Sequence, residues 1–175
     1  MSCFLKIDDG KTRAVLTFKR DQLLYDIKNC AFIEGSVAEA EVSDHVRHMI
    51  QDIGEDGNVD RVTRVLDLVV AECREKLYAF TKHAVHRPEL DDQFKETDVY
   101  GIVLDLPAGF SQTTLNYLEK LIHEYLVYST LADWLGTTLP AKAGLWAGKA
   151  QNMEREIQTS MHVRIKRTRI SLHPF

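Results

Sequence analysis

The strongest constraint on the fold is an apolar stripe of helical spacing in the last third of the chain. It predicts one long helix over Leu115–Leu135, which Ser111 can cap at its start. Gly136 suits a left-handed position after the helix end, and Pro140 suits the first turn of a final helix over Ala141–Met161. The expected buried residues are Leu115, Leu118, Leu121, Ile122, Tyr125, Leu126, Leu131 and Trp134 or Leu135, followed by Leu145, Trp146, Ala150, Met153 and Ile157. Two long neighbouring helices indicate a mainly α-helical fold.

A short basic segment, residues 162–175, follows this pair of helices. It holds four cations and no acid, which leaves 18 basic against 26 acidic residues, or −8, in the rest of the chain. An acidic body argues against non-specific nucleic-acid binding by the body itself, so the basic segment is the part suited to phosphate or an acidic partner. The candidate partner-binding residues are Arg164, Lys166, Arg167, Arg169, Ile170, Leu172, Pro174 and Phe175.

Loose alternation of apolar and cationic residues in this segment favours an extended conformation. Three interpretations stay open: an arm that joins the sheet edge of a neighbouring subunit, a final strand paired with the chain's own hairpin, or a contact with nucleic-acid phosphates.

The first third predicts a small β element. Apolar runs over Cys3–Ile7 and Ala14–Phe18 flank an Asp-Gly turn, which is typical of a β-hairpin. Alternation over Val99–Leu106 predicts one further half-buried strand, with Tyr100, Ile102, Leu104 and Leu106 on its buried face. A short helix is expected over Asp21–Phe32, with Gly35 ending it.

Two more helices are expected in the middle of the chain. Ser36 and Glu39 have the spacing of a capping box, which predicts a helix reaching Ile53. Asn58 then caps a helix whose apolar stripe runs from Val62 to Phe80. Because the connection is short, these two helices should pack as an antiparallel pair. Residues 84–98 are polar and are expected to form an exposed loop.

These elements fit one domain over residues 1–161, a bundle of about four to five helices with an N-terminal hairpin and a strand near 99–106. Residues 162–175 are expected to form an extended C-terminal arm. The three cysteines are far apart and favour a reducing compartment. No leader peptide and no membrane span is expected.

Few residues suggest a catalytic or metal-binding role. His45 and His48 stand three apart on a predicted helix and could hold a metal, but the sequence specifies no third ligand, so a surface or packing role is preferred. His83 and His86 make a weaker pair in the polar loop. His123 and Glu124 are adjacent in a helix, so they cannot form an acid/base dyad, and His123 is expected at the edge of the core. The sequence therefore predicts no catalytic residue, no cofactor and no metal.

The end of the chain resembles a known type of protein. Leu126-Val-Tyr-Ser-Thr-Leu-Ala-Asp-Trp-Leu135, the Thr-Leu-Pro140 break, Trp146-Ala-Gly-Lys-Ala150 and the Arg-rich end resemble small virion proteins of Bacteroidales phages and prophages. The architecture is similar to head–tail connector (adaptor or neck) proteins of tailed phages. The resemblance covers about residues 29–175, although the N-terminal hairpin and the 84–98 loop make this chain larger than the smallest connectors.

The resemblance implies a non-enzymatic neck subunit that forms a ring, commonly of twelve copies in that family. It implies contacts with the portal protein and with other neck or tail proteins, and a channel through which genomic DNA passes without sequence-specific binding. The expected location is the virion neck, and the host cytoplasm during assembly, with no membrane partner. Two alternatives from other classes are a small nucleic-acid-binding regulator that uses the basic segment, and a metal-dependent enzyme built on His45 and His48.

Overall fold

The computed structural model describes residues 3–6, 11–37, 43–81, 97–107 and 109–162. Within them the chain forms the following elements in order: β1 (Cys3–Lys6), β2 (Lys11–Lys19), α1 (Arg20–Val37), α2 (Asp44–Gln51), the 3-10 turn η1 (Asp52–Gly54), α3 (Asp56–Lys76), α4 (Tyr78–Thr81), β3 (Val99–Pro107), α5 (Gln112–Thr138) and α6 (Pro140–His162). The predicted fold class, mainly α with an N-terminal hairpin and one later strand, is confirmed.

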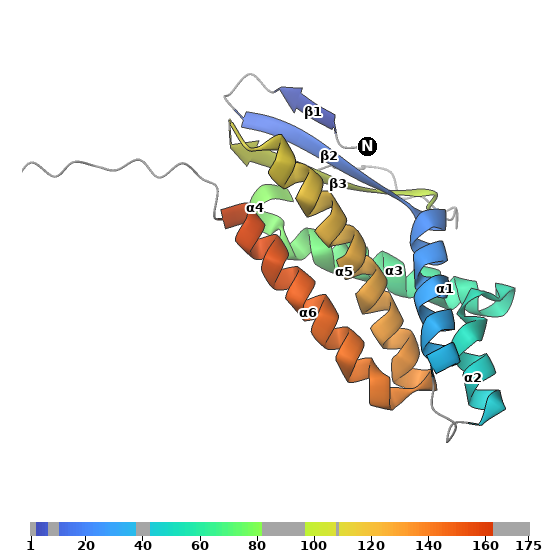
Figure 1. Ribbon diagram of the computed structural model, residues 1–175. Coiled ribbons are helices and arrows are strands. Elements are labelled where there is room, and N and C mark those ends of the chain that lie inside the picture. Colours follow the sequence, from blue (N-terminus) through green and yellow to red (C-terminus); the bar gives the residue numbers. More distant parts are fainter. Residues whose placement is uncertain (1–2, 7–10, 38–42, 82–96, 108, 163–175) are drawn as a thin grey trace, which may run out of the picture.

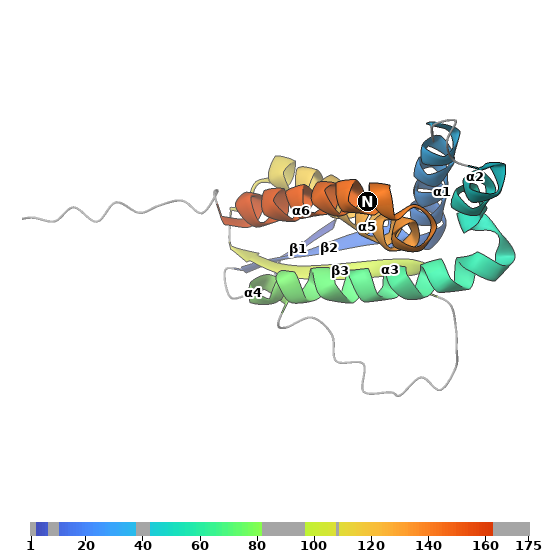
Figure 2. The ribbon, with the colours of Figure 1, turned by 90° about the horizontal axis from the view of Figure 1, so that it is seen from below.

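The three strands form one antiparallel sheet in the order β1-β2-β3, and its inner face packs on α5. Along β3 the side chains alternate between buried and half-exposed, as the sequence predicts. The outer edge of β3 is covered by α3 and α4 (Figure 2). Arg74 of α3 donates from Nε and Nη2 to the Gly101 carbonyl, at 3.2 and 2.7 Å, and Tyr100 Oη donates to Asp67 Oδ1 at 2.6 Å. A helix therefore covers an edge that would otherwise attract other strands.

The helices α5 and α6 form an antiparallel hairpin beneath the sheet (Figure 1). The Ser111 side chain accepts a hydrogen bond from the Thr114 amide at the start of α5, which confirms the predicted cap. All the residues predicted to be buried on α5 are buried, including both Trp134 and Leu135. Gly136 does not end the helix, because α5 continues to Thr138 and the turn is made at Leu139 before Pro140. On α6 the expected burial of Leu145 is wrong, since its side chain is 53% exposed.

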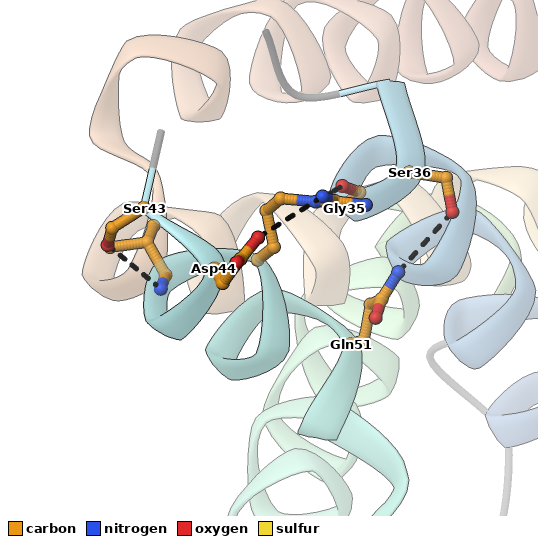
Figure 3. A network of polar contacts seen from close by, with 7 residues as sticks. Gly35, Ser36, Ser43, Asp44 and Gln51 are labelled. Carbon is orange, nitrogen blue, oxygen red and sulfur yellow. Dashed lines mark hydrogen bonds and ion pairs between the residues drawn. The ribbon is translucent and has the colours of Figure 1, made fainter. Parts of the chain in front are cut away.

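The structure corrects the predicted boundary between the first two helices. Gly35 does not end α1, which continues to Val37, and Ser36 lies in its last turn, where its hydroxyl donates to the Phe32 carbonyl at 2.8 Å. Ser36 is therefore no N-cap. The cap of α2 is Ser43, whose side chain accepts from the Val46 amide (Figure 3).

The predicted antiparallel pairing of the second and third helices is also wrong. The helix expected to reach Ile53 is only the short α2, which packs against α1 and α5, whereas α3 packs against α5. Asn58 does not cap α3, because the cap position is Glu55. The Asn58 side chain instead donates to the Asp52 carbonyl at 2.8 Å and so ties α3 to the preceding 3-10 turn.

α1 and α2 approach each other closely at Gly35. A Cβ added there would lie 2.7 Å from Gln51 Cγ and 3.2 Å from the Arg47 carbonyl oxygen. We expect Gly35→Leu to force the two helices apart and to lower the free energy of unfolding by about 1–3 kcal/mol, as measured by urea denaturation. Gly144→Ala is the matched control, since a Cβ on that helical glycine meets nothing within 4 Å. It should leave stability unchanged or raise it by up to about 1 kcal/mol.

Candidate functional site: an exposed apolar helix face and a polar pocket

One side of α1 carries large apolar side chains that face solvent. Four of them are more than half exposed: Tyr25 (64%), Phe32 (59%), Ile33 (52%) and Val37 (67%). We call these four residues the α1 apolar face. The buried residues of α1, namely Leu23, Ile27, Ala31 and Gly35, are spaced four apart and lie on the other side of the helix. No described residue covers the four side chains of the α1 apolar face.

Polar contacts from α2 fix the end of α1 that carries much of this face (Figure 3). Arg47 Nε donates to the Gly35 carbonyl at 3.3 Å, and Gln51 Nε2 donates to Ser36 Oγ at 3.3 Å. Arg47 also pairs with Asp44 at 3.4 Å. The last carbonyls of a helix have no partner within the helix, and here side chains of α2 supply some of the donors. The end of α1 is therefore held in place while its apolar side chains stay exposed.

A pocket of about 500 Å³ opens between the end of β2, the first turns of α1 and the first half of α5. We call it the β2 pocket. Its wall includes residues 17–19 of β2, together with Gln22 and Asp26 of α1. The residues that α5 contributes to its wall are Glu119, Lys120, His123 and Glu124. A pocket of this size is within the usual range for ligand sites, and this one is lined by charged groups of both signs.

The wall of the β2 pocket includes a side-chain contact between α1 and α5. His123 Nε2 lies 2.8 Å from Asp26 Oδ2, and Gln22 Nε2 also donates to the Asp26 carboxylate at 3.1–3.2 Å. Both side chains of the pair are partly exposed. The expectation that His123 lies at the edge of the core agrees with its position, and its partner is Asp26 and not the adjacent Glu124. Since a carboxylate fixes the orientation of the imidazole, the pair holds α1 against α5.

Polar and aromatic side chains also meet where α1 faces α6. Trp146 Nε1 donates to Glu34 Oε1 at 3.1 Å, and the Lys149 ammonium lies 3.6 Å from the centre of the Trp146 ring. Burial raises the pKa of the Cys30 thiol, and the nearby Glu124 and Asp26 charges raise it further. The Cys30 thiol is therefore protonated at neutral pH, which is unfavourable for a nucleophile.

The predicted site residues fall in different places. All eight candidate partner-binding residues of the basic segment lie outside the described residues, as do His83 and His86. His45 and His48 are exposed on α2. Across the described part of the chain, no group of three or more histidine, cysteine, aspartate or glutamate side chains is placed to hold a metal ion. No described helix is both long enough and apolar enough to span a bilayer.

The sequence did contain a signal for the α1 apolar face. Apolar residues occur on more than one side of the segment from Leu23 to Val37, whereas a surface helix usually has one apolar stripe. Such a helix is either buried all round or contacts a partner, and the structure leaves its outer side exposed.

Comparison of the chain with protein-family models, with curated proteins and with solved structures finds no match.

Three groups whose pKa is raised in the folded chain predict a loss of stability at alkaline pH: Cys73 and Lys76 of α3, and Tyr128 of α5. Burial raises the pKa of the Cys73 thiol from 9.0 to about 12. Burial alone would lower the pKa of the Lys76 ammonium, but hydrogen bonds to Glu154 (2.7 Å) and Tyr125 (3.0 Å) raise it to about 12. Burial, and then a hydrogen bond with Glu124, raises the pKa of Tyr128 to about 12.

In each of these three cases the folded state holds its proton to higher pH than the unfolded chain does. The stabilisation is therefore complete below pH 9 and is lost as pH rises from 9 to about 12. We expect the free energy of unfolding to fall over this window, as followed by urea denaturation at a series of pH values. Cys73→Ala should make the fall shallower by up to about 1.4 kcal/mol per pH unit. An equal slope in the variant would contradict the assignment.

Proposed function

We propose that this chain is a non-enzymatic structural subunit of a tailed-phage virion, a head–tail connector of the neck that joins the portal to the tail through protein–protein contacts. The observation that carries the proposal is the α1 apolar face. Large apolar side chains in one exposed group are typical of surfaces that become buried in an assembly. The helical body with its small sheet agrees with the architecture that the resemblance implies.

The partner we assign to the α1 apolar face is the next copy of this chain. Leu68 and Tyr78 are also exposed large apolar side chains, and they belong to α3 and α4, which lie on another side of the molecule from α1 (Figure 2). A contact that is repeated around an axis needs two different surfaces on each subunit. Exposed apolar residues on two sides of the molecule favour such a head-to-tail contact and a closed ring.

The distribution of charge supports a role around DNA without binding it. The body has a net charge of −8 outside the basic segment. A net negative channel wall repels phosphate, so genomic DNA can slide through it. The proposed location is accordingly the virion neck, with assembly in the host cytoplasm.

Removal of the basic segment tests this proposal directly. A variant that ends at Met161 should keep the helical circular dichroism and the unfolding midpoint of the full chain, because the buried core lies within residues 14–161. We expect it to stay monomeric in analytical ultracentrifugation under conditions in which the full chain assembles. Assembly of the truncated chain to the same size would contradict the proposed role of the segment.

A further inference from the structure

Within the described part of the chain, one edge of the sheet is only partly paired. β1 pairs with Thr12–Val15 of β2, whereas β3 pairs with β2 along its whole length to Lys19. On the side of β2 away from β3, the described residues provide no strand partner for residues 16–19. An unpaired stretch of strand offers backbone donors and acceptors to any extended segment that lies beside it.

The β2 pocket lies at this same stretch, since residues 17–19 form part of its wall. Three carboxylates line it, Asp26, Glu119 and Glu124, together with Lys19, Lys120 and His123, whose Nε2 contacts Asp26. A strand added next to residues 16–19 would place alternate side chains toward α5 and therefore into the pocket. The pocket can thus select cationic side chains while the strand edge supplies the backbone hydrogen bonds.

We propose that this edge and the β2 pocket bind the basic segment of a second copy of the chain, which adds to the sheet as a fourth strand. The inference rests on the proposed function, because it assigns a receptor site to the assembly. The cations of the segment, Arg164, Lys166, Arg167 and Arg169, would meet the pocket carboxylates.

The length and the starting point of the segment favour a neighbouring copy. Thirteen residues follow His162, and extended they span about 40 Å. α6 ends near the end of the sheet where β2 begins, opposite the junction of β2 and α1 where the pocket lies (Figure 1). A segment that starts at one end of the molecule and a site at the other end are the two halves of a head-to-tail contact.

Zero-length cross-linking of isotope-mixed protein tests the inference. Unlabelled and ¹⁵N-labelled full chains are mixed at high concentration and treated with a carbodiimide, which joins amines to carboxylates in contact. Lys166 is the one lysine of the basic segment, so each of its links reports the position of the segment. We expect mixed-isotope peptides that join Lys166 to Asp26, Glu119 or Glu124. Links from Lys19 or Lys120 to these carboxylates within one chain serve as a positive control.

Each other outcome overturns the inference in a distinct way. Lys166–pocket links of one isotope only would show that the segment binds its own subunit. Mixed-isotope links elsewhere, with none at the pocket, would refute this site and leave the proposed assembly intact. No mixed-isotope link at all would contradict both the site and the assembly.

A matched pair of variants separates the pocket from general charge. Glu119→Gln with Glu124→Gln removes two pocket carboxylates and keeps their shape, and we expect the Lys166–Asp26 link to fall at least tenfold. Glu72→Gln with Glu156→Gln, at exposed positions on α3 and α6, removes the same charge and should leave that link unchanged. If both pairs of substitutions lower the Lys166–Asp26 link equally, only long-range charge attraction is at work, and the pocket does not bind the segment.

Discussion

Replacing Trp134 by alanine is expected to lower the free energy of unfolding by about 3–5 kcal/mol. Trp134 is buried where α5 meets α2, and its indole Nε1 donates to the Ile50 carbonyl at 3.1 Å. That carbonyl belongs to the last turn of α2, where backbone carbonyls have no amide donor within the helix. The alanine variant therefore leaves both a cavity and an unpaired buried carbonyl, and the loss should be measured by urea denaturation.

Trp134→Phe separates these two contributions, because it keeps most of the apolar volume and removes only the donor. We expect it to cost about 1–3 kcal/mol, the usual cost of an unsatisfied buried polar group. Trp146→Phe is the matched control, since the Trp146 indole donates to the partly exposed Glu34 and water can replace it. A cost below about 1 kcal/mol for Trp134→Ala would mean that Trp134 does not hold α2 in place.

Replacing Phe32 and Ile33 together by glutamate is expected to abolish self-assembly and leave the fold intact. Both side chains are more than half exposed on the α1 apolar face, so the monomer loses little packing. In the assembly the two charges would have to be buried without partners, which is strongly unfavourable. Size-exclusion chromatography with light scattering should show a monomer at concentrations where the unmodified chain associates.

Two other exposed apolar residues provide the control for this pair. Tyr117 and Leu145 are about half exposed on α5 and α6, and they lie outside the α1 apolar face. Tyr117→Glu with Leu145→Glu adds the same charge and should leave assembly unchanged. If both pairs abolish assembly equally, the effect follows from net charge and the α1 apolar face is not the interface.

The sequence predicts best those elements whose signals are local. Alternation places the buried face of β3 correctly, and Ser111 and Pro140 mark the starts of α5 and α6 because caps and the fixed φ of proline act within one turn. Gly35 and Gly136 mislead for a physical reason. Glycine ends a helix where it takes a left-handed conformation, and neither residue has a positive φ, since both lie inside helices.

The features of the candidate site depend on contacts between distant parts of the chain. Asp26 and His123 are 97 residues apart and meet only because β2 and α1 pack on α5. Among the described residues, β1 pairs with β2 only along Thr12–Val15, and the apolar run over residues 3–7 does not reveal that register. Side-chain periodicity predicts which face of an element is buried, but it does not predict which faces meet.

We propose that this chain is completed by copies of itself through the α1 apolar face and the basic segment. Native mass spectrometry of the concentrated full chain tests it most directly. We predict a closed oligomer with a single copy number, which disappears in the Phe32→Glu, Ile33→Glu variant. A full chain that stays monomeric at every concentration would contradict the claim.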